Sequence, residues 1–389
     1  MSCNLAPIVL FVYNRPEHTR RTVEALRANR LAPRSRLFVF SDGPKNDEAR
    51  PKVEAVRRYV GSISGFDSVE VVEREANQGL AASIIAGVTQ VVEECGKVIV
   101  LEDDLLTSPY FLDYMNEGLE LYKEEEEVAS VQAHMFPMRG GVLPRSFFLP
   151  VTGSWGWGAW SRSWRLFNPD AEYLLGEIRR RGLSRVFDLN HTYPYTRLLE
   201  QQVAGKIDSW AIRWYASLFL LGKISLFPYR PFVANIGFDG SGRHCGRFDA
   251  GAVDASLAKS HLPLVVHPAI VDAKVRDAYT RALKSWTSPV LPRRLLRRIK
   301  IALVSLGDTV VKTLLRFFVR GGGVFKRRVR RLFVLAFIPS GCRIHRDALI
   351  DYSASLVNLS EKGAGIRIGA FSVVKGEILT LTAEGEIEL

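Results

Sequence analysis

The first 110 residues alternate between continuous apolar runs and segments whose apolar residues have helical spacing. The apolar runs lie at residues 8–13, 37–40 and 98–101, and a further strand is expected at 69–72. The segments with helical spacing are residues 17–28, 48–60 and 79–95. Continuous apolar runs are typical of strands covered on both faces, and strands that alternate with helices are typical of parallel sheets. The pattern therefore predicts an α/β fold, with a mostly parallel sheet and helices on both of its faces.

Polar residues follow the predicted strands at the points where the apolar runs end. They are Arg15, Asp42, Asn77 and the consecutive acids Glu102, Asp103 and Asp104. Sheets of this kind bind ligands beyond the carboxyl ends of their strands. We therefore expect these side chains to lie along one edge of the sheet and to form a binding site.

Three changes of pattern divide the rest of the chain. Residues 128–250 are rich in Trp, Tyr and Gly, which predicts loops and shorter elements. Residues 293–331 interleave Lys and Arg with aliphatic residues, and residues 341–389 contain short β-rich units. We expect two halves of one domain at 1–127 and 128–285, a basic amphipathic helical segment at 290–340, and a partial left-handed β-helix at 341–389. The last region resembles the first coils of the hexapeptide-repeat acyltransferases.

The net charge of +12 and the pI near 9.6 indicate an anionic partner. Much of this charge lies in residues 293–331, where a pair of basic amphipathic helices is expected on either side of Gly321–Gly323. Aliphatic residues between the cations fit an anionic membrane surface better than nucleic acid, so we predict membrane docking and no nucleic-acid partner. The alternative is a solvated charged face that covers the core.

Two features of the sequence favour a cytoplasmic location. The four cysteines are scattered without metal-ligand spacing, which suits a reducing compartment. The first apolar run lacks a preceding basic region and a cleavage site, and no apolar run reaches about 20 residues. We expect a cytoplasmic protein, peripheral on the inner face of the cytoplasmic membrane.

The acidic turn at residues 102–104 is suited to a divalent metal. A hard cation such as Mg²⁺ or Mn²⁺ binds one or two carboxylates and leaves its other positions to phosphates and water. Such a cation neutralises the charge that develops on a diphosphate leaving group. The alternative is that these acids cap a helix starting near Ser108 and Pro109.

Seven segments, taken together and in order, resemble a known family. They are FVYNRP, FSDGPK, ANQGLAASI, VLEDDL, SWGWGAW, DSWAIRWY and NIGFDGSGRHCG, and the resemblance covers roughly residues 5–250. The succession resembles bacterial sugar transferases grouped with N-acetylglucosaminyltransferase I. This resemblance implies a GT-A fold, the Rossmann-like fold of nucleotide-diphospho-sugar transferases, with a metal-dependent and inverting activity.

The resemblance implies a role for each residue of the predicted site. Arg15 and Asp42 would hold the nucleotide, and Asp104 would bind Mn²⁺ or Mg²⁺. Asp208 would be the catalytic base, although the animal enzymes have two adjacent acids where this chain has Asp208 and Ser209. The remaining residues of the predicted donor site are Asn77, Gln78, Glu102, Asp103, Trp155 and His244.

Three of these positions also have simpler interpretations. Asp208 suits an inverting base, but it could instead cap the helix expected at 209–221. Trp155 is the tryptophan expected to stack on a sugar ring, whereas Trp157 and Trp160 are expected to include core residues. His244 lies in a glycine-rich segment, and His134 has no assigned role.

The sequence as a whole predicts a glycosyltransferase. It would transfer a sugar from a nucleoside diphosphate donor, with UDP favoured by the resemblance, to a glycan or lipid-linked acceptor in polysaccharide biosynthesis. A sugar nucleotidyltransferase is the first alternative, but the chain lacks a glycine-rich loop after its first strand. A non-enzymatic membrane adaptor or assembly protein is the second.

Overall fold

The computed structural model describes residues 5–138, 144–238, 257–260 and 263–287, together with short strands between residues 343 and 388. The chain divides into two compact units, residues 1–288 and 289–389. The basic segment 293–331 and His244 lie outside the described residues.

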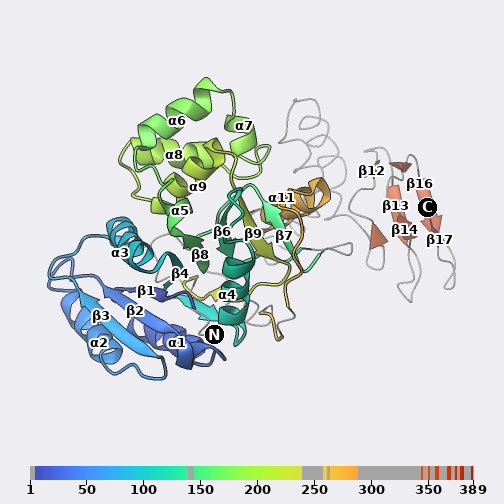
Figure 1. Cartoon of the computed structure of the whole chain (residues 1–389). Helices are drawn as coiled ribbons and strands as arrows, with labels where there is room; N and C mark the ends of the chain where they lie inside the picture. The colour runs from blue at the N-terminus through green and yellow to red at the C-terminus, as the bar shows by residue number, and fades with distance from the viewer. Residues whose placement is uncertain are drawn as a thin grey trace. The chain divides into compact units, whose positions relative to one another are not determined.

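An eight-stranded sheet forms the centre of the first unit (Figure 1). Its strands in chain order are β1 (Ile8–Val12), β2 (Arg36–Ser41), β3 (Ser68–Glu73), β4 (Lys97–Glu102), β6 (Val128–Gln132), β7 (Ser146–Leu149), β8 (Trp157–Trp160) and β9 (Ile224–Pro228). The spatial order is β3-β2-β1-β4-β8-β6-β9-β7. The first four strands run parallel, β8 is antiparallel to both neighbours, and β7 is antiparallel to β9.

This arrangement confirms the predicted α/β class with a mostly parallel sheet of the GT-A type. The region after residue 127 contributes four strands to the same sheet, so it is more regular than the loops expected there. A separate two-stranded sheet pairs β5 (Leu105–Thr107) with β10 (Val233–Asn235) in antiparallel register. This small sheet joins the acidic turn to a segment about 130 residues later.

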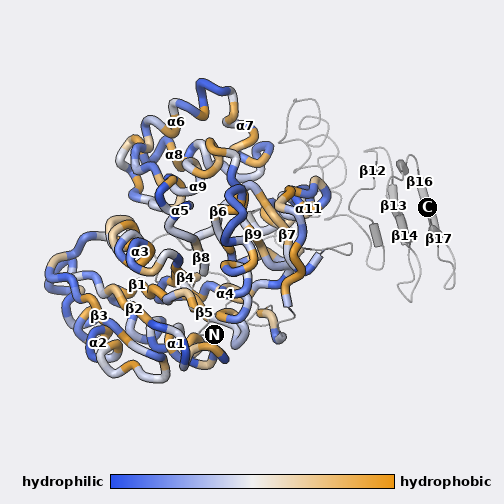
Figure 2. The backbone as a smooth tube through the Cα atoms, in the orientation of Figure 1, coloured by the Kyte–Doolittle hydropathy of each residue, from blue (hydrophilic) through white to orange (hydrophobic). Residues whose placement is uncertain are grey.

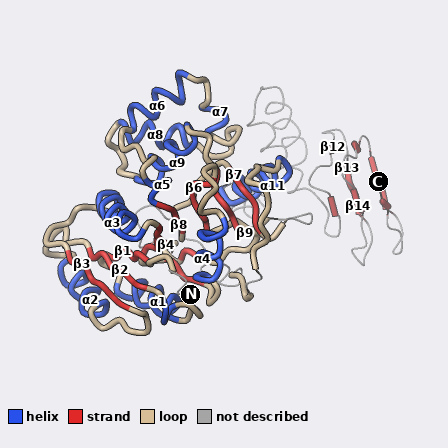
Figure 3. Tube along the Cα trace, viewed as in Figure 1, coloured by secondary structure: helices blue, strands red, loops and turns tan. Residues whose placement is uncertain are grey.

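Helices cover both faces of the sheet (Figure 3). They are α1 (Pro16–Arg27), α2 (Arg50–Val60), α3 (Leu80–Cys95), α4 (Phe111–Leu121), α5 (Ser161–Trp164), α6 (Ala171–Arg180), α7 (Ser184–Phe187), α8 (Tyr195–Val203), α9 (Trp210–Leu220) and α11 (Ala273–Thr287), with a 3₁₀ turn η1 (Ala32–Arg34). In the described part of the chain, no helix is long and apolar enough to cross a membrane.

The first strand shows why its apolar run is continuous. Leu10 and Val12 belong to the core cluster that includes residues of α1, α2 and α4, whereas Val9 and Phe11 belong to the cluster that includes residues of α3 and α9. Alternate residues therefore meet opposite layers of helices, and both sets must be apolar. Figure 2 shows hydrophobic positions along β1 and β2 and mixed positions along the covering helices.

Four buried tryptophans attach α9 to the sheet. Trp157 of β8 stacks on Trp210 with ring centroids 5.2 Å apart and on Trp164 at 5.7 Å. Trp164 also lies 5.1 Å from Trp214. Trp157, Trp160 and Trp164 are therefore core residues, as expected for most tryptophans of this region.

The described residues of the second unit form seven short strands: β11 (Arg343–Ile344), β12 (Leu349–Ile350), β13 (Ser355–Asn358), β14 (Ile366–Ile368), β15 (Val373–Val374), β16 (Glu377–Thr380) and β17 (Ile387–Glu388). All of their pairings are parallel, in the orders β11-β14-β17, β12-β15 and β13-β16. The left-handed β-helix expected here stays a prediction, as do the domain boundaries expected from the sequence.

Candidate active site

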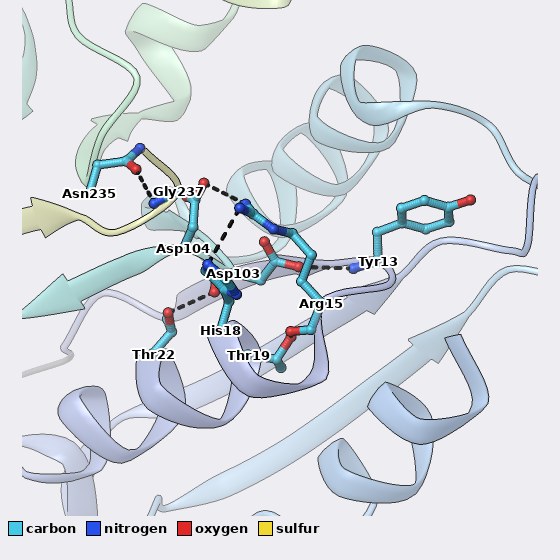
Figure 4. Close-up of polar contacts among 9 residues, drawn as sticks. All are labelled: Tyr13, Arg15, His18, Thr19, Thr22, Asp103, Asp104, Asn235 and Gly237. Atoms are coloured by element: carbon cyan, nitrogen blue, oxygen red, sulfur yellow. Dashed lines mark hydrogen bonds and ion pairs between the residues drawn. The ribbon is translucent and has the colours of Figure 1, made fainter. Parts of the chain in front are cut away.

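The acidic turn lies at the carboxyl end of β4 and is held by the first strand and helix (Figure 4). Glu102 is the last residue of β4 and is paired with Phe11 of β1. The backbone N–H of Tyr13 donates to Asp103 Oδ2 at 3.3 Å, and Thr22 Oγ1 donates to the Asp103 carbonyl at 2.8 Å. These contacts orient the turn, so its carboxylates have a fixed position at the sheet edge.

Arg15 lies directly against the acidic turn. Its Nη1 is 2.9 Å from Asp104 Oδ2, and the two side chains are 18% and 16% exposed. Its Nη2 lies 3.4 Å from Nε2 of His18 in the first turn of α1. The Arg15 carbonyl accepts both the N–H and the hydroxyl of Thr19, which places Arg15 at the start of the helix. The structure thus brings together three predicted site residues, Arg15, Asp103 and Asp104.

The segment after β10 packs against Asp104. The Ile236 N–H donates to the Asp104 carbonyl at 2.9 Å, and the Gly237 N–H donates to Asn235 Oδ1 at 2.7 Å. A Cβ built at Gly237 would overlap Asp104 Oδ2, so a side chain does not fit there beside the carboxylate. No local pattern of the sequence indicates that Asn235, Gly237 or His18 belongs to the site.

The carboxyl groups of the turn are difficult to ionise together. Burial and the charge of Asp104 raise the pKa of Asp103 to about 7, against the opposing effect of Arg15. Burial and the charges of Asp104 and Asp103 raise the pKa of Glu102 well above its usual value. Burial also raises the pKa of Asp104, although Arg15 lowers it. One guanidinium near three acids therefore leaves an excess of negative charge that a cation would relieve.

This donor set fits a hard divalent cation. Carboxylate oxygens are the ligands that such cations prefer, and the Asp104 carboxylate sits in a fixed position between Arg15 and Gly237. Within the described ranges, no three His, Cys, Asp or Glu side chains are grouped so as to hold a metal ion by themselves. A cation at Asp104 would therefore share its coordination with phosphate oxygens and water, as hard cations in nucleotide sites commonly do.

The raised pKa of Asp103 predicts that metal binding depends on pH. With its folded pKa at about 7, Asp103 keeps a proton in the folded chain between about pH 4 and pH 7 that the unfolded chain has lost. This proton stabilises the folded state at low pH, and the stabilisation is lost as the pH rises through 7. The positive charge of a cation on the neighbouring Asp104 favours the ionised form of Asp103, so cation binding is linked to loss of this proton. We therefore expect Mn²⁺ affinity to fall as the pH drops below 7, by at most about tenfold per pH unit. Titration calorimetry at pH 6 and pH 8 measures this, and equal affinities would contradict it.

Asp42 forms a second cluster beside the first. The N–H groups of Gly43 and Gln78 donate to its Oδ1, both at 2.9 Å. Asn77 Nδ2 and the Gly79 N–H donate to its Oδ2 at 2.9 Å and 3.0 Å. A carboxylate has about four acceptor positions, so these four donors use all of them. Asp42 therefore fixes the turn that leads into α3, and its predicted contact with a nucleotide stays a prediction.

Replacing Asp42 with Asn is expected to destabilise the fold. Asn offers one acceptor oxygen, so two of the four N–H donors, which are buried or partly buried, would lose their partner, at a cost of about 1–3 kcal/mol in the free energy of unfolding. Urea denaturation of the purified variant measures this cost. Asp67→Asn, at an exposed position before β3, is the matched control and should change stability by less than about 0.5 kcal/mol. If Asp42→Asn loses no more stability than the control, the four hydrogen bonds to Asp42 do not stabilise the fold.

The two clusters meet at the end of β1. The Asp42 N–H donates to the Val12 carbonyl at 3.2 Å, and the Lys45 N–H donates to the Tyr13 hydroxyl at 3.1 Å. The ends of parallel strands β1, β2 and β4 thus bring residues that lie up to 90 positions apart in the sequence to one edge. This is the placement expected from the apolar pattern.

Trp155 belongs to an aromatic cluster close to the acidic turn. Its ring lies 4.6 Å from that of His134 and 5.4 Å from that of Phe238, the residue after Gly237. Phe136 completes the group, with its ring 5.1 Å from that of His134. Trp155 is half-buried, whereas Trp157 is fully buried, so Trp155 remains the tryptophan to test for ligand contact.

Asp208 lies outside both clusters. Its side chain is 65% exposed, and Oδ1 accepts from Arg213 Nη2 at 2.9 Å. The cap of α9 is Ser209, whose hydroxyl accepts the Ile212 N–H at 3.4 Å, so the interpretation of Asp208 as a helix cap is wrong. The acidic turn does not cap a helix either, because β5 follows it and α4 begins only at Phe111.

Comparison with known proteins gives a family match for the first third of the chain. Residues 8–142 match the family model described as Glycosyl transferase family 2. The match includes Arg15, Asp42 and the acidic turn, and it confirms the prediction that the chain is a glycosyltransferase. The finer resemblance to N-acetylglucosaminyltransferase I stays a prediction. A comparison with curated proteins gave no match.

Several solved structures are similar to part of the chain. Mannosyltransferase PcManGT from Pyrobaculum calidifontis, in complex with GDP-Man and Mn²⁺, is 11% identical over 56% of this chain and 70% of its own, with a TM-score of 0.32. Glucosyl-3-phosphoglycerate synthase from Mycobacterium tuberculosis, in complex with Mn²⁺, UDP and glucosyl-3-phosphoglycerate, is 16% identical over 46% and 67%, with a TM-score of 0.27. TarS from S. aureus is 16% identical over 36% of this chain and 24% of its own, with a TM-score of 0.25, so the chain spans about a quarter of that protein.

Proposed function

We propose that this chain transfers a sugar from a nucleoside diphosphate donor to a glycan or lipid-linked acceptor, with a divalent cation held by Asp104. The observation that carries the proposal is the cluster of Glu102, Asp103 and Asp104 at the carboxyl end of β4, with Arg15 Nη1 2.9 Å from Asp104. Three acids with raised pKa values beside one guanidinium suit a cation and a diphosphate bound together.

The two clusters suggest a division of the donor between them. Asp104 and Arg15 lie side by side, so a cation on the carboxylate and a diphosphate on the guanidinium would be neighbours. Asp42 fixes the turn at Asn77 and Gln78, which would border the nucleoside. A divalent cation at this place supplies charge neutralisation for the departing nucleoside diphosphate.

Arg15 is bound to the carboxylate that would hold the cation. Arg15 Nη1 is bound to Asp104 Oδ2, the oxygen that also faces Gly237. Binding of a cation would displace the guanidinium from this oxygen and leave it available to a phosphate oxygen. Arginine is suited to this role because its planar group binds phosphate with two parallel N–H donors.

Asp208 remains our candidate for the base that deprotonates the acceptor hydroxyl. Its carboxylate is exposed and hence open to an acceptor, and Arg213 holds it through an ion pair. Inverting transfer needs such a carboxylate on the acceptor side of the sugar. Docking through residues 293–331 on an anionic membrane, at the cytoplasmic face, is part of the same proposal and suits a lipid-linked acceptor.

The proposal is tested with a panel of UDP-, GDP-, CMP- and dTDP-sugars, with and without Mn²⁺. Ligands that bind the folded state raise its melting temperature by mass action. We expect one nucleotide class to stabilise the full chain, and only in the presence of the metal. Absence of stabilisation by every donor, followed by absence of sugar transfer to membrane extracts, would refute the proposal.

A further inference from the structure

His134 has one ring nitrogen with a clear partner and one without. It follows β6, and its Nδ1 lies 3.2 Å from the Val233 carbonyl of β10. A carbonyl oxygen only accepts, so Nδ1 carries the proton. Burial lowers the pKa of His134 to about 4, which keeps the ring neutral at physiological pH. Nε2 is therefore a hydrogen-bond acceptor.

The Nε2 atom is buried and has no hydrogen-bond partner among the described residues. The rings nearest to His134 are those of Trp155 and Phe136, which meet it edge-on with interplanar angles of 70° and 88°. Buried acceptors without a partner are uncommon in native proteins, because each loses a hydrogen bond to water and gains none. A ligand hydroxyl would satisfy this atom once one of the two half-buried rings turns aside.

The position of His134 connects it to the acidic turn. Val233, its partner, lies two residues before Asn235, and Asn235 is paired with Leu105, the residue after Asp104. Two residues of a strand span about 7 Å, which is roughly the width of a sugar ring and its hydroxyl. Phe238, which contacts Trp155, directly follows Gly237, the residue against Asp104. A ligand with its diphosphate at the acidic turn therefore has its sugar within reach of this cluster.

We propose that His134 and Trp155 form a pyranose subsite, in which a sugar hydroxyl donates to His134 Nε2 and a C–H face of the ring packs on the indole of Trp155. The inference rests on the proposed function, since it assigns a place to one of the sugars of that reaction. A neutral histidine next to aromatic rings suits a polyol with an apolar face, because it offers an acceptor without charge. The sugar of the donor and the terminal sugar of the acceptor share this chemistry, and the experiment distinguishes them.

The experiment compares the full-length wild type with His134→Phe and His134→Gln. Phenylalanine keeps an aromatic ring and removes the acceptor, whereas glutamine can place its Oε1 near the position of Nε2. Calorimetry in Mn²⁺ measures the affinity for UDP, GDP, UDP-glucose, UDP-N-acetylglucosamine and GDP-mannose, and transfer assays measure the KM of the acceptor. His267→Phe is the matched control, because His267 also packs against aromatic rings, those of Tyr122 and Phe148.

We expect His134→Phe to bind the free nucleoside diphosphate as the wild type does. If the subsite holds the donor sugar, its affinity for the intact nucleotide sugar falls about tenfold or more; if it holds the acceptor sugar, the acceptor KM rises by a similar factor. His134→Gln should recover part of either loss. Wild-type donor affinity and acceptor KM in a folded His134→Phe variant would overturn the subsite and leave the proposed function standing.

Deoxygenated ligands test the same contact without changing the protein. Among the monodeoxy analogues of the sugar, one should bind the wild type about tenfold more weakly than the parent sugar and bind His134→Phe with no further loss. Equal binding of all analogues to the wild type would overturn the subsite. Failure of the wild type to bind any nucleotide sugar or acceptor would overturn both the subsite and the proposed function.

Discussion

Replacing Asp104 with Asn is expected to lower metal-dependent sugar transfer by more than about 100-fold. Asp104 is the acid of the turn that carries both the Arg15 contact and the close approach of Gly237. Asparagine keeps the shape of the side chain and removes the negative charge that a divalent cation needs. Calorimetric titration measures the loss of Mn²⁺ affinity, and transfer rates at saturating donor measure the loss of turnover.

The stability of Asp104→Asn separates this role from a structural one. Burial disfavours the ionised carboxylate and offsets the favourable contact with Arg15, so its removal should change the metal-free melting temperature little, even though Arg15 loses a partner. Asp47→Asn, in which the carboxylate replaced is 97% exposed, is the control and should retain full transfer. A folded Asp104→Asn variant with Mn²⁺-dependent transfer near the wild-type rate would contradict the assignment.

Gly237→Ala is expected to have the second largest effect, with Mn²⁺ affinity and transfer lowered about 10- to 100-fold. The added Cβ would overlap Asp104 Oδ2 and would lie 3.1 Å from Asn235 Oδ1. The Ile236 N–H fixes the Asp104 backbone through its carbonyl, and Arg15 binds the carboxylate, so the carboxylate can move away from the added Cβ only at the expense of its contact with Arg15. All three acids stay in the chain, so the variant tests their placement and not their charge.

Gly176→Ala is the matched control for this substitution. Gly176 lies in α6, and a Cβ there meets no atom within 4 Å, so we expect unchanged transfer and a gain of about 0.5–1 kcal/mol in stability from the better helix former. Metal titration and thermal denaturation of both variants complete the comparison. If Gly237→Ala binds Mn²⁺ as tightly as Gly176→Ala does, the contact with Asp104 does not limit the site.

The parallel half of the sheet could be predicted because burial on both faces leaves a continuous apolar run. In β1, β2 and β4, alternate residues pack on different layers of helices, so every residue of the run is buried and apolar. Strands β6 to β9 were not predicted, since they are only four or five residues long and pair across up to about 95 positions. The helix α11 was not predicted either.

The site was predictable to the extent that it lies at the ends of parallel strands. Arg15 and Asp104 were both expected at one edge, and the structure places them in contact. Asn235 and Gly237 reach the site through the antiparallel pairing of β10 with β5, which no local pattern indicates. The four hydrogen bonds to Asp42 could not be predicted either, because a Ser-Asp-Gly-Pro turn does not show which N–H groups will face the carboxylate.

The stacked indoles beneath α9 have a consequence for optical spectroscopy. Trp157 lies 5.2 Å from Trp210 and 5.7 Å from Trp164, close enough for their electronic transitions to couple as excitons. The far-ultraviolet circular dichroism of the folded chain should therefore contain a tryptophan couplet superimposed on the helix signal. Helix content fitted from that spectrum without the couplet will be wrong. The couplet itself will report separation of α9 from β8, even in a state that keeps all its helices.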